Sequence, residues 1–182
     1  MKDFSLHILD IAENSIKAEA RKIEIRIETN SKEDLLSLEI RDDGKGMDKE
    51  TIKMALDPFF TTKESRRFGL GLPLLAQAAK LANGSICIES KPGEGTRVKA
   101  TFQASHIDTK PLGDIPQTVV TLMMGHPEVD ILYSHKIDDS EYCFDTREMR
   151  AQLNGMPVNS PEVIRFARKN IKEGLDNLRR RK

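Results

Sequence analysis

The chain has 182 residues, which is enough for one ordinary domain with an appended region and a sizeable core. Its 29 basic and 29 acidic residues cancel, so no overall field favours nucleic acid or a membrane surface. The apolar runs are too short to span a bilayer, and the charged N-terminus lacks the apolar segment of a signal peptide. Tryptophan is absent and tyrosine is rare, which argues against a platform for stacked bases.

The two cysteines, Cys87 and Cys143, are far apart in the sequence and show no spacing typical of a metal site. We expect both to be buried, reduced thiols. Unpaired thiols, together with the missing export signal, indicate a soluble, cytoplasmic protein.

The first 104 residues predict one α/β unit, a mixed sheet with helices on one face. The first helix has an apolar stripe at helical spacing, formed by Leu6, Leu9, Ala12 and Ile16 and widened by Ile8 and Ile11. Turn residues separate the later segments, and Asp48 is placed to cap a short helix. The expected elements are helices over 4–20, 49–56 and 71–82 and strands over 22–29, 35–41, 85–90 and 96–104.

Residues 105–182 predict a smaller α+β extension, because the composition changes near "SHIDTKPLGDIP". The expected order is a helix over 115–125, a hairpin over 129–146, a short helix to Leu153 and a long helix that starts at Ser160-Pro161. The last helix has an apolar stripe suited to packing on another element. We expect this extension to dock a partner or to mediate dimerisation.

The first helix carries a second pattern opposite its apolar stripe. Asp10, Glu13, Asn14 and Lys17 are spaced i, i+3, i+4 and i+7, so they share one face of the helix. A solvated helix face explains such a row on its own. The row also combines a base, an amide oxygen suited to a metal and an ammonium suited to phosphate.

Five short segments resemble the boxes of the GHKL ATPase superfamily in order and spacing within residues 6–96; they are "LDIAENSIKA", "DDGKGM", "PFFTTK", "GLGL" and "GEGT". This superfamily comprises the ATP-binding domains of histidine kinases, gyrase-type topoisomerases, Hsp90 chaperones and mismatch-repair ATPases. The chain is most similar to the histidine-kinase type, in a stand-alone form. The resemblance implies the Bergerat fold, a two-layer α/β sandwich in which ATP and Mg²⁺ lie between helices and a lid.

On the adenine side, the resemblance implies that Asp42 accepts a hydrogen bond from the exocyclic amino group, which an ionised carboxylate is suited to do. Gly44 and Gly46 would let the chain pass close beneath the base, and Met47 would add apolar packing. Thr96 matches a residue that supports the adenine aspartate.

On the phosphate side, Asn14 matches the asparagine that binds Mg²⁺, and Lys17 matches a lysine that often contacts phosphate in histidine kinases. Two segments resemble the two ends of the lid; they are Thr61, Thr62 and Lys63, and Gly69, Leu70, Gly71 and Leu72. The second segment would offer backbone N–H groups at a helix start to the phosphates.

The candidate catalytic residues are Asp10 and Glu13. Hydrolytic relatives and anti-sigma serine kinases carry Glu four residues before the Mg²⁺ asparagine, where histidine kinases commonly carry Asn. Asp10 stands at this position with a shorter reach, and as a carboxylate it could polarise water or a hydroxyl. Glu13 is the poorer candidate and is expected to pair with Lys17 or solvent. His7, on the same helix, is expected to be structural.

The leading hypothesis is an Mg-ATP-binding, histidine-kinase-like protein that transfers phosphate to, or regulates, a separate partner protein. An anti-sigma-type serine/threonine kinase is one alternative, which Asp10 favours. The other alternative is an ATP-gated binding module without phosphoryl transfer, in which ATP changes the affinity for a partner.

Overall fold

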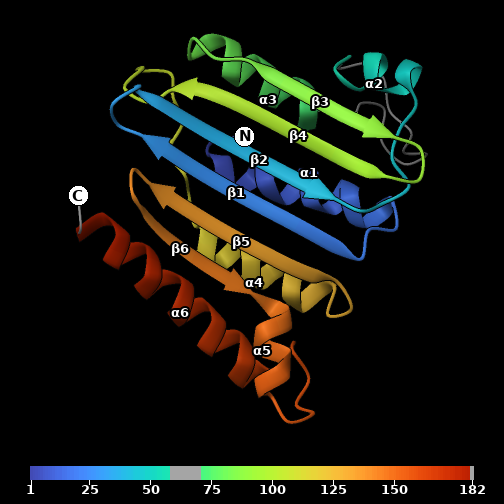
Figure 1. Cartoon of the computed structure of the whole chain (residues 1–182), viewed down its shortest axis with the longest axis vertical. Coiled ribbons are helices and arrows are strands. Elements are labelled where there is room, and N and C mark those ends of the chain that lie inside the picture. The colour runs from blue at the N-terminus through green and yellow to red at the C-terminus, as the bar shows by residue number, and fades with distance from the viewer. Residues whose placement is uncertain (58–70, 181–182) are drawn as a thin grey trace.

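The computed structural model describes residues 1–57 and 71–180 of the chain. These residues form a six-stranded sheet with the strand order β3-β4-β2-β1-β5-β6 and with helices against one face (Figure 1). The strands are β1 (Lys22–Asn30), β2 (Leu35–Asp42), β3 (Ile86–Lys91), β4 (Gly95–Gln103), β5 (Asp130–Ile137) and β6 (Ser140–Asp145). The helices are α1 (Phe4–Lys17), α2 (Lys49–Ala55), α3 (Gly71–Leu81), α4 (Ile115–Gly125), α5 (Thr146–Gln152) and α6 (Pro161–Arg180). The expected two-layer α/β sandwich is confirmed.

The C-terminal part of the chain extends the same sheet as the N-terminal part. β1, β2, β4 and β3 pair antiparallel in turn, whereas β5 runs parallel to β1, from Lys22 opposite Asp130 to Thr29 opposite Ile137. Helix α4, which precedes β5, lies on the helical face beside α1. The division between residues 104 and 105 stays a prediction, but the segments on either side of it share one sheet.

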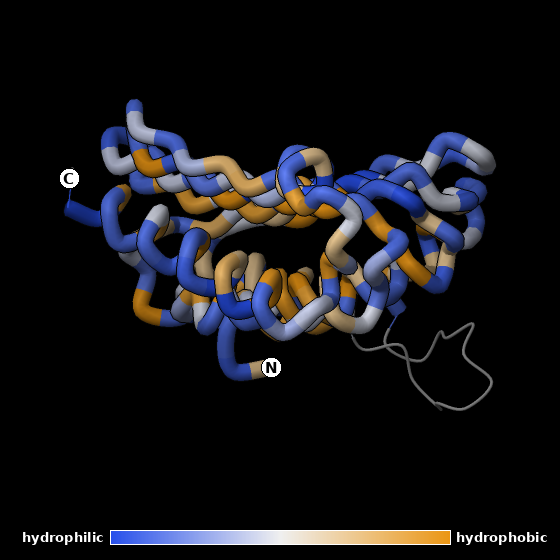
Figure 2. Tube along the Cα trace, turned by 90° about the horizontal axis from the view of Figure 1, so that it is seen from below, coloured by the Kyte–Doolittle hydropathy of each residue, from blue (hydrophilic) through white to orange (hydrophobic). Residues whose placement is uncertain are grey.

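The core lies between the sheet and the helices, where apolar residues of both layers meet (Figure 2). Ile23, Ile25 and Ile27 are buried and alternate with charged residues along β1, as a strand with one wet face requires. Phe4 of α1 packs on Phe102 of β4, with ring centroids 4.5 Å apart. Helix α6 packs on α4 and beside β6 through a buried stripe; its members are Val163, Ala167, Ile171, Leu175 and Leu178.

The apolar stripe predicted for the first helix is confirmed in part, since Ile8, Ile11 and Ala12 are buried. Leu6 is 43% exposed, whereas Leu9 and Ile16 are half-buried. The buried face is centred on Phe4, Ile8 and Ile11, so it lies toward the widened edge of the predicted stripe. Because α1 is packed between α3 and α4 as well as on the sheet, its apolar surface is wider than one stripe.

The expectation of buried cysteines is wrong. Cys87 and Cys143 are both exposed free thiols. Cys87 lies on β3 and Cys143 on β6, which are the outermost strands, and both side chains project from the face that the helices leave open. Among the helices of the described residues, every one is too short or too polar to traverse a lipid bilayer.

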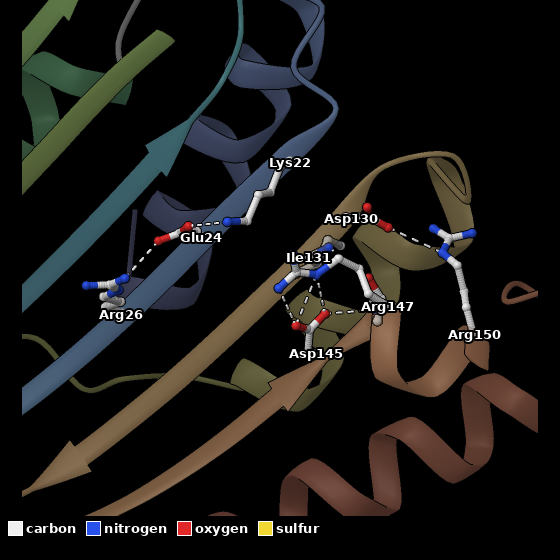
Figure 3. A network of polar contacts seen from close by, with 9 residues as sticks. Lys22, Glu24, Arg26, Asp130, Ile131, Asp145, Arg147 and Arg150 are labelled. Carbon is white, nitrogen blue, oxygen red and sulfur yellow. Dashed lines mark hydrogen bonds and ion pairs between the residues drawn. The ribbon is translucent and has the colours of Figure 1, made fainter. Parts of the chain in front are cut away.

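The open face of the sheet carries charged contacts that keep it solvated (Figure 3). On β1, Glu24 pairs with Lys22 at 2.5 Å and with Arg26 at 2.8 Å, and the hydrogen bond from Lys22 is the main cause of the lowered pKa of Glu24. At the end of β6, Asp145 caps α5 and pairs with Arg147 at 2.6 Å, and the Arg147 hydrogen bond lowers the pKa of Asp145. The described helices therefore cover one face, while paired charges occupy the other.

Two histidines lie in the core with unsatisfied ring nitrogens. His7 on α1 is completely buried, and neither of its ring nitrogens bonds another group of the described chain. His135 on β5 shares a hydrogen bond of 2.8 Å between its Nδ1 and the Tyr133 hydroxyl, whereas its buried Nε2 has no partner within residues 1–57 and 71–180. Burial lowers the pKa of each imidazole to about 4.

We predict that these two histidines weaken the fold at acid pH. Their imidazoles titrate near pH 6.5 when unfolded but near pH 4 when folded, so the unfolded chain binds more protons between these values. The free energy of unfolding should therefore keep its full value above about pH 6.5 and fall as the pH approaches 4. Denaturant titrations at several pH values measure this fall. In His7→Leu the fall should be smaller than in the parent chain, and an identical pH dependence would contradict the assignment.

Candidate functional site

The geometry of the site centres on the carboxylate of Asp42, the last residue of β2. Asp42 is only 8% exposed. Its Oδ1 accepts the backbone N–H of Gly44 at 3.0 Å and of Thr96 at 3.2 Å. Its Oδ2 accepts the hydroxyl of Ser15, on α1, at 2.5 Å. Three donors, from α1, β4 and the loop after β2, therefore hold one buried carboxylate and compensate for its removal from water.

The loop after Asp42 is packed against α1 and against the turn between β3 and β4. The N–H of Lys45 donates to the Ala18 carbonyl, at the end of α1, at 2.8 Å. Gly46 has a φ of +67°, and a Cβ there would lie 1.9 Å from the Lys91 carbonyl oxygen. A Cβ on Gly44 would likewise meet the Ala18 oxygen at 2.7 Å. These glycines allow close backbone approach within the protein, and their contact with a base stays a prediction.

Ser90 joins this loop to β4. Its Oγ accepts the N–H of Met47 at 2.8 Å, donates to the Gly95 carbonyl at 2.8 Å and lies 2.9 Å from the Thr96 hydroxyl. Thr96 therefore supports Asp42 through its backbone N–H, while its side chain is bonded to Ser90. Met47, predicted to pack on the base, is half-buried beside this network.

The polar face of α1 lies against the start of α3. The Asn14 amide nitrogen donates to Asp10 Oδ2 at 3.4 Å. A Cβ on Gly71, the first residue of α3, would lie 1.8 Å from the same Asp10 oxygen, so α3 begins in direct contact with Asp10. The structure thus brings Asp10, Asn14 and Gly71 together, and Ser15 connects the same helix to Asp42. Leu72 follows in the first turn of α3 and is half-buried.

Glu13 was expected to pair with Lys17 or to face solvent, but the two side chains are not paired in the structure. Glu13 Oε1 lies 3.2 Å from Nε2 of His126, the residue that ends α4. Lys17 is exposed at the end of α1 and makes no ion pair with any residue of the described ranges. The C-terminal part of the chain therefore reaches the polar face of α1.

The oxygen atoms on this face can bind Mg²⁺ only if phosphate oxygens supply further ligands. Because the Asn14 amide nitrogen faces Asp10, the amide oxygen is the Asn14 atom that remains for a cation. Mg²⁺ prefers oxygen ligands and usually keeps waters and substrate phosphate oxygens. Within the described ranges, no group of three His, Cys, Asp or Glu residues is placed to hold a metal by itself.

Five predicted site residues lie outside the described residues; they are Thr61, Thr62, Lys63, Gly69 and Leu70. A groove of about 420 Å³ lies beside the Asp42 network, and most of its lining charges belong to the open face of the sheet. That groove is lined by Arg41 and Arg97, among others, but not by Asp10, Asn14 or Asp42. It adjoins the site through Ser90 and Thr96, which line it and also belong to the network around Asp42.

Three residues of the site were not predicted from the sequence. Ser15 and Ser90 hold Asp42 and its loop, and His126 contacts Glu13. A buried serine directly after Asn14 on the same helix is a weak signal that the helix turns a hydroxyl toward the sheet. No sequence signal identifies Ser90 or His126, because both depend on the packing of distant segments.

The N-terminal part of the chain is similar to known ATPase and kinase sequences. The family described as histidine kinase-, DNA gyrase B-, and HSP90-like ATPase matches residues 3–106. The sensor histidine kinase YxdK of Bacillus subtilis (strain 168) is 37% identical over 98 residues, which are 50% of this chain and 30% of that protein. The signal transduction histidine-protein kinase AtoS of Escherichia coli (strain K12) is 38% identical over 96 residues, 52% of this chain and 15% of that protein. The matched segments thus span less than a third of either relative.

A solved structure described as the N-terminal domain of a DNA repair protein has a TM-score of 0.53 with 14% sequence identity. The match covers 94% of this chain and 56% of that one, so it includes the strands and helices beyond residue 106. At this identity the likeness concerns the fold alone. It agrees with the Bergerat-type two-layer sandwich.

We predict that Gly46→Ala destabilises the protein more than Gly93→Ala. Both glycines have positive φ values, +67° and +81°, so both substitutions strain the backbone by about 1 kcal/mol. Only at Gly46 would the new Cβ also clash with a carbonyl, that of Lys91, whereas Gly93 faces open space. Denaturant titration of the two variants measures the difference. Equal losses of unfolding free energy would contradict the close packing of this loop.

Proposed function

The chain belongs to the family of histidine kinase-, DNA gyrase B-, and HSP90-like ATPases, and we propose that it binds Mg-ATP to phosphorylate or regulate a separate protein. Its matched relatives include sensor histidine kinases, which supports an ATP-binding domain of the histidine-kinase-like type. The observation that carries the proposal is the buried Asp42 carboxylate, held by three donors from three parts of the chain.

The hydrogen-bonding pattern of Asp42 suits the recognition of adenine. An ionised carboxylate has about four acceptor positions, and three protein donors occupy three of them. We propose that the remaining position accepts the exocyclic amino group of adenine. Gly44, Gly46, Met47 and Thr96 surround this carboxylate or its loop, which supports their assignment to the base-binding side.

The phosphates would lie along the polar face of α1. We assign the amide oxygen of Asn14 to Mg²⁺, shared with phosphate oxygens, and Lys17 to a direct phosphate contact. Gly71 and Leu72, at the start of α3, would present backbone N–H groups beside Asp10. We retain Thr61, Thr62, Lys63, Gly69 and Leu70 as lid residues on the resemblance alone. The bound Mg²⁺ would neutralise phosphate charge during transfer.

We assign the role of general base to Asp10 and not to Glu13. Asp10 lies between Asn14 and Gly71, whereas Glu13 is engaged by His126 at the end of α4. A carboxylate at Asp10 would take a proton from a protein hydroxyl or from water during attack on the terminal phosphate. A serine/threonine kinase of the anti-sigma type is favoured by this carboxylate. The alternative function that involves no phosphoryl transfer is that of an ATP-gated binding module.

We further propose a cytoplasmic location, since the two exposed thiols fit a reducing compartment. Residues 105–182 would dock the partner protein or mediate dimerisation. Their most direct route to the nucleotide is the contact between His126 and Glu13.

Asp42→Asn should lower the affinity for ATP by about tenfold or more, because it presents an amide donor where an acceptor is required. Asp43→Asn is the matched control. Asp43 is exposed, and its Oδ1 accepts the N–H groups of Arg21 and Lys22 at 2.8 Å, which an asparagine oxygen can still do. Isothermal titration with Mg-ATP measures both variants. Unchanged affinity in Asp42→Asn would remove the adenine assignment.

Asp10→Asn should abolish phosphoryl transfer or ATP turnover while ATP binding is kept. Asp3→Asn makes the same change at the N-cap of the same helix, where asparagine caps equally well, and should leave turnover intact. The measurement uses radiolabelled ATP with partner proteins recovered in its presence. Label on a protein supports a kinase, free phosphate alone supports an ATPase, and ATP binding without either supports the gated module.

A further inference from the structure

Glu13 and Lys17 occupy positions i and i+4 of α1, with the acidic residue first. This is the orientation in which a helix favours a side-chain ion pair. The structure nevertheless directs Glu13 away from Lys17 and toward His126, at 3.2 Å from Nε2. Within the residues that the structure describes, the Lys17 ammonium makes no ion pair. The local preference of the helix is therefore overridden by a contact from α4.

His126 is held firmly enough to make this contact. Its backbone N–H donates to the Leu122 carbonyl at 2.9 Å, and its own carbonyl accepts the N–H of Val129 at 3.1 Å. Its Nδ1 lies 3.8 Å from Glu128, so the imidazole stands between two carboxylates, those of Glu13 and Glu128. The His126 side chain is 25% exposed, so part of the ring is shielded from water.

The contact changes the electrostatics of the face assigned to phosphate. If Glu13 were released, its carboxylate would be free to pair with Lys17, four residues along the helix. The same negative charge would also repel an incoming phosphate. Both effects oppose binding of a nucleotide through Lys17, and His126 limits them by holding the Glu13 carboxylate in a hydrogen bond away from Lys17.

We propose that His126 is a positioning residue that holds Glu13 away from Lys17 and so keeps the Lys17 ammonium available for the phosphates of ATP. The inference rests on the proposed function, because it assumes that Lys17 contacts phosphate. It assigns a part in nucleotide binding to a residue beyond the segment matched by the ATPase family, which ends at residue 106.

The test is a set of calorimetric titrations of the full chain with Mg-ATP and, separately, with adenosine. His126→Ala should weaken Mg-ATP binding about two- to fivefold, the scale of a surface ion pair together with a nearby like charge. Adenosine binding should not change, because adenosine has no phosphate. Adding Glu13→Gln to His126→Ala should restore the affinity for Mg-ATP. His126→Gln alone should keep it, since the glutamine amide can still donate to Glu13.

Controls separate this role from simple damage to the fold. His106→Ala changes another histidine of the C-terminal part. His106 accepts the backbone N–H of Asp108 and bonds no residue of α1, so this variant should leave both affinities unchanged. Equal Mg-ATP affinity in His126→Ala and the parent chain would overturn the inference, as would a failure of Glu13→Gln to restore it. If Lys17→Met binds Mg-ATP as tightly as the parent, the phosphate assignment of Lys17 is wrong. If the parent chain binds no Mg-ATP, the proposed function itself fails.

Discussion

The three hydrogen bonds to Asp42 are the constraint on which the rest of the arrangement depends. A carboxylate that is 8% exposed loses most of its hydration, and it is stable there only if protein donors replace the water. Those donors come from α1, from β4 and from the loop that follows Asp42, so their convergence fixes the position of the helix relative to the sheet. The register that sets Asp42 opposite Thr96 and the packing of α1 are therefore parts of one requirement.

The same helix also joins the two halves of the chain. On one side α1 meets the start of α3 at Asp10, and on the other it packs along α4, which ends at His126. β5 continues the sheet by pairing with β1, so the residues beyond 106 share a core with the ATPase-like part. A change in the C-terminal part can thus reach α1 through side-chain contacts and through the sheet, without an intervening flexible linker.

Much of the fold follows from periodicity, because alternating isoleucines and helical stripes report local burial directly. Asp10, Asn14 and Asp42 were identified as site residues because their spacing matches known boxes. Leu6, which belongs to the predicted stripe of α1 but is exposed, shows the limit of that method: a helix buried on three sides no longer has a single apolar stripe. Ser15, Ser90 and His126 depend on which distant segments meet, and local spacing carries no information about that. The exposed cysteines were misjudged because the average burial of cysteine does not predict the exposure of one cysteine on a particular edge strand.

The cysteine positions have a consequence for oxidation. Cys87 and Cys143 lie in one cross-strand row, with Lys99, Glu39, Arg26 and Ser134 on the four strands between them. At about 4.8 Å per strand, their backbones are separated by about 24 Å, far beyond the reach of a disulfide. An oxidant therefore has no intramolecular bridge to form between them. Any disulfide that these thiols make with each other must join separate molecules, and it would link them at the rims of their sheets.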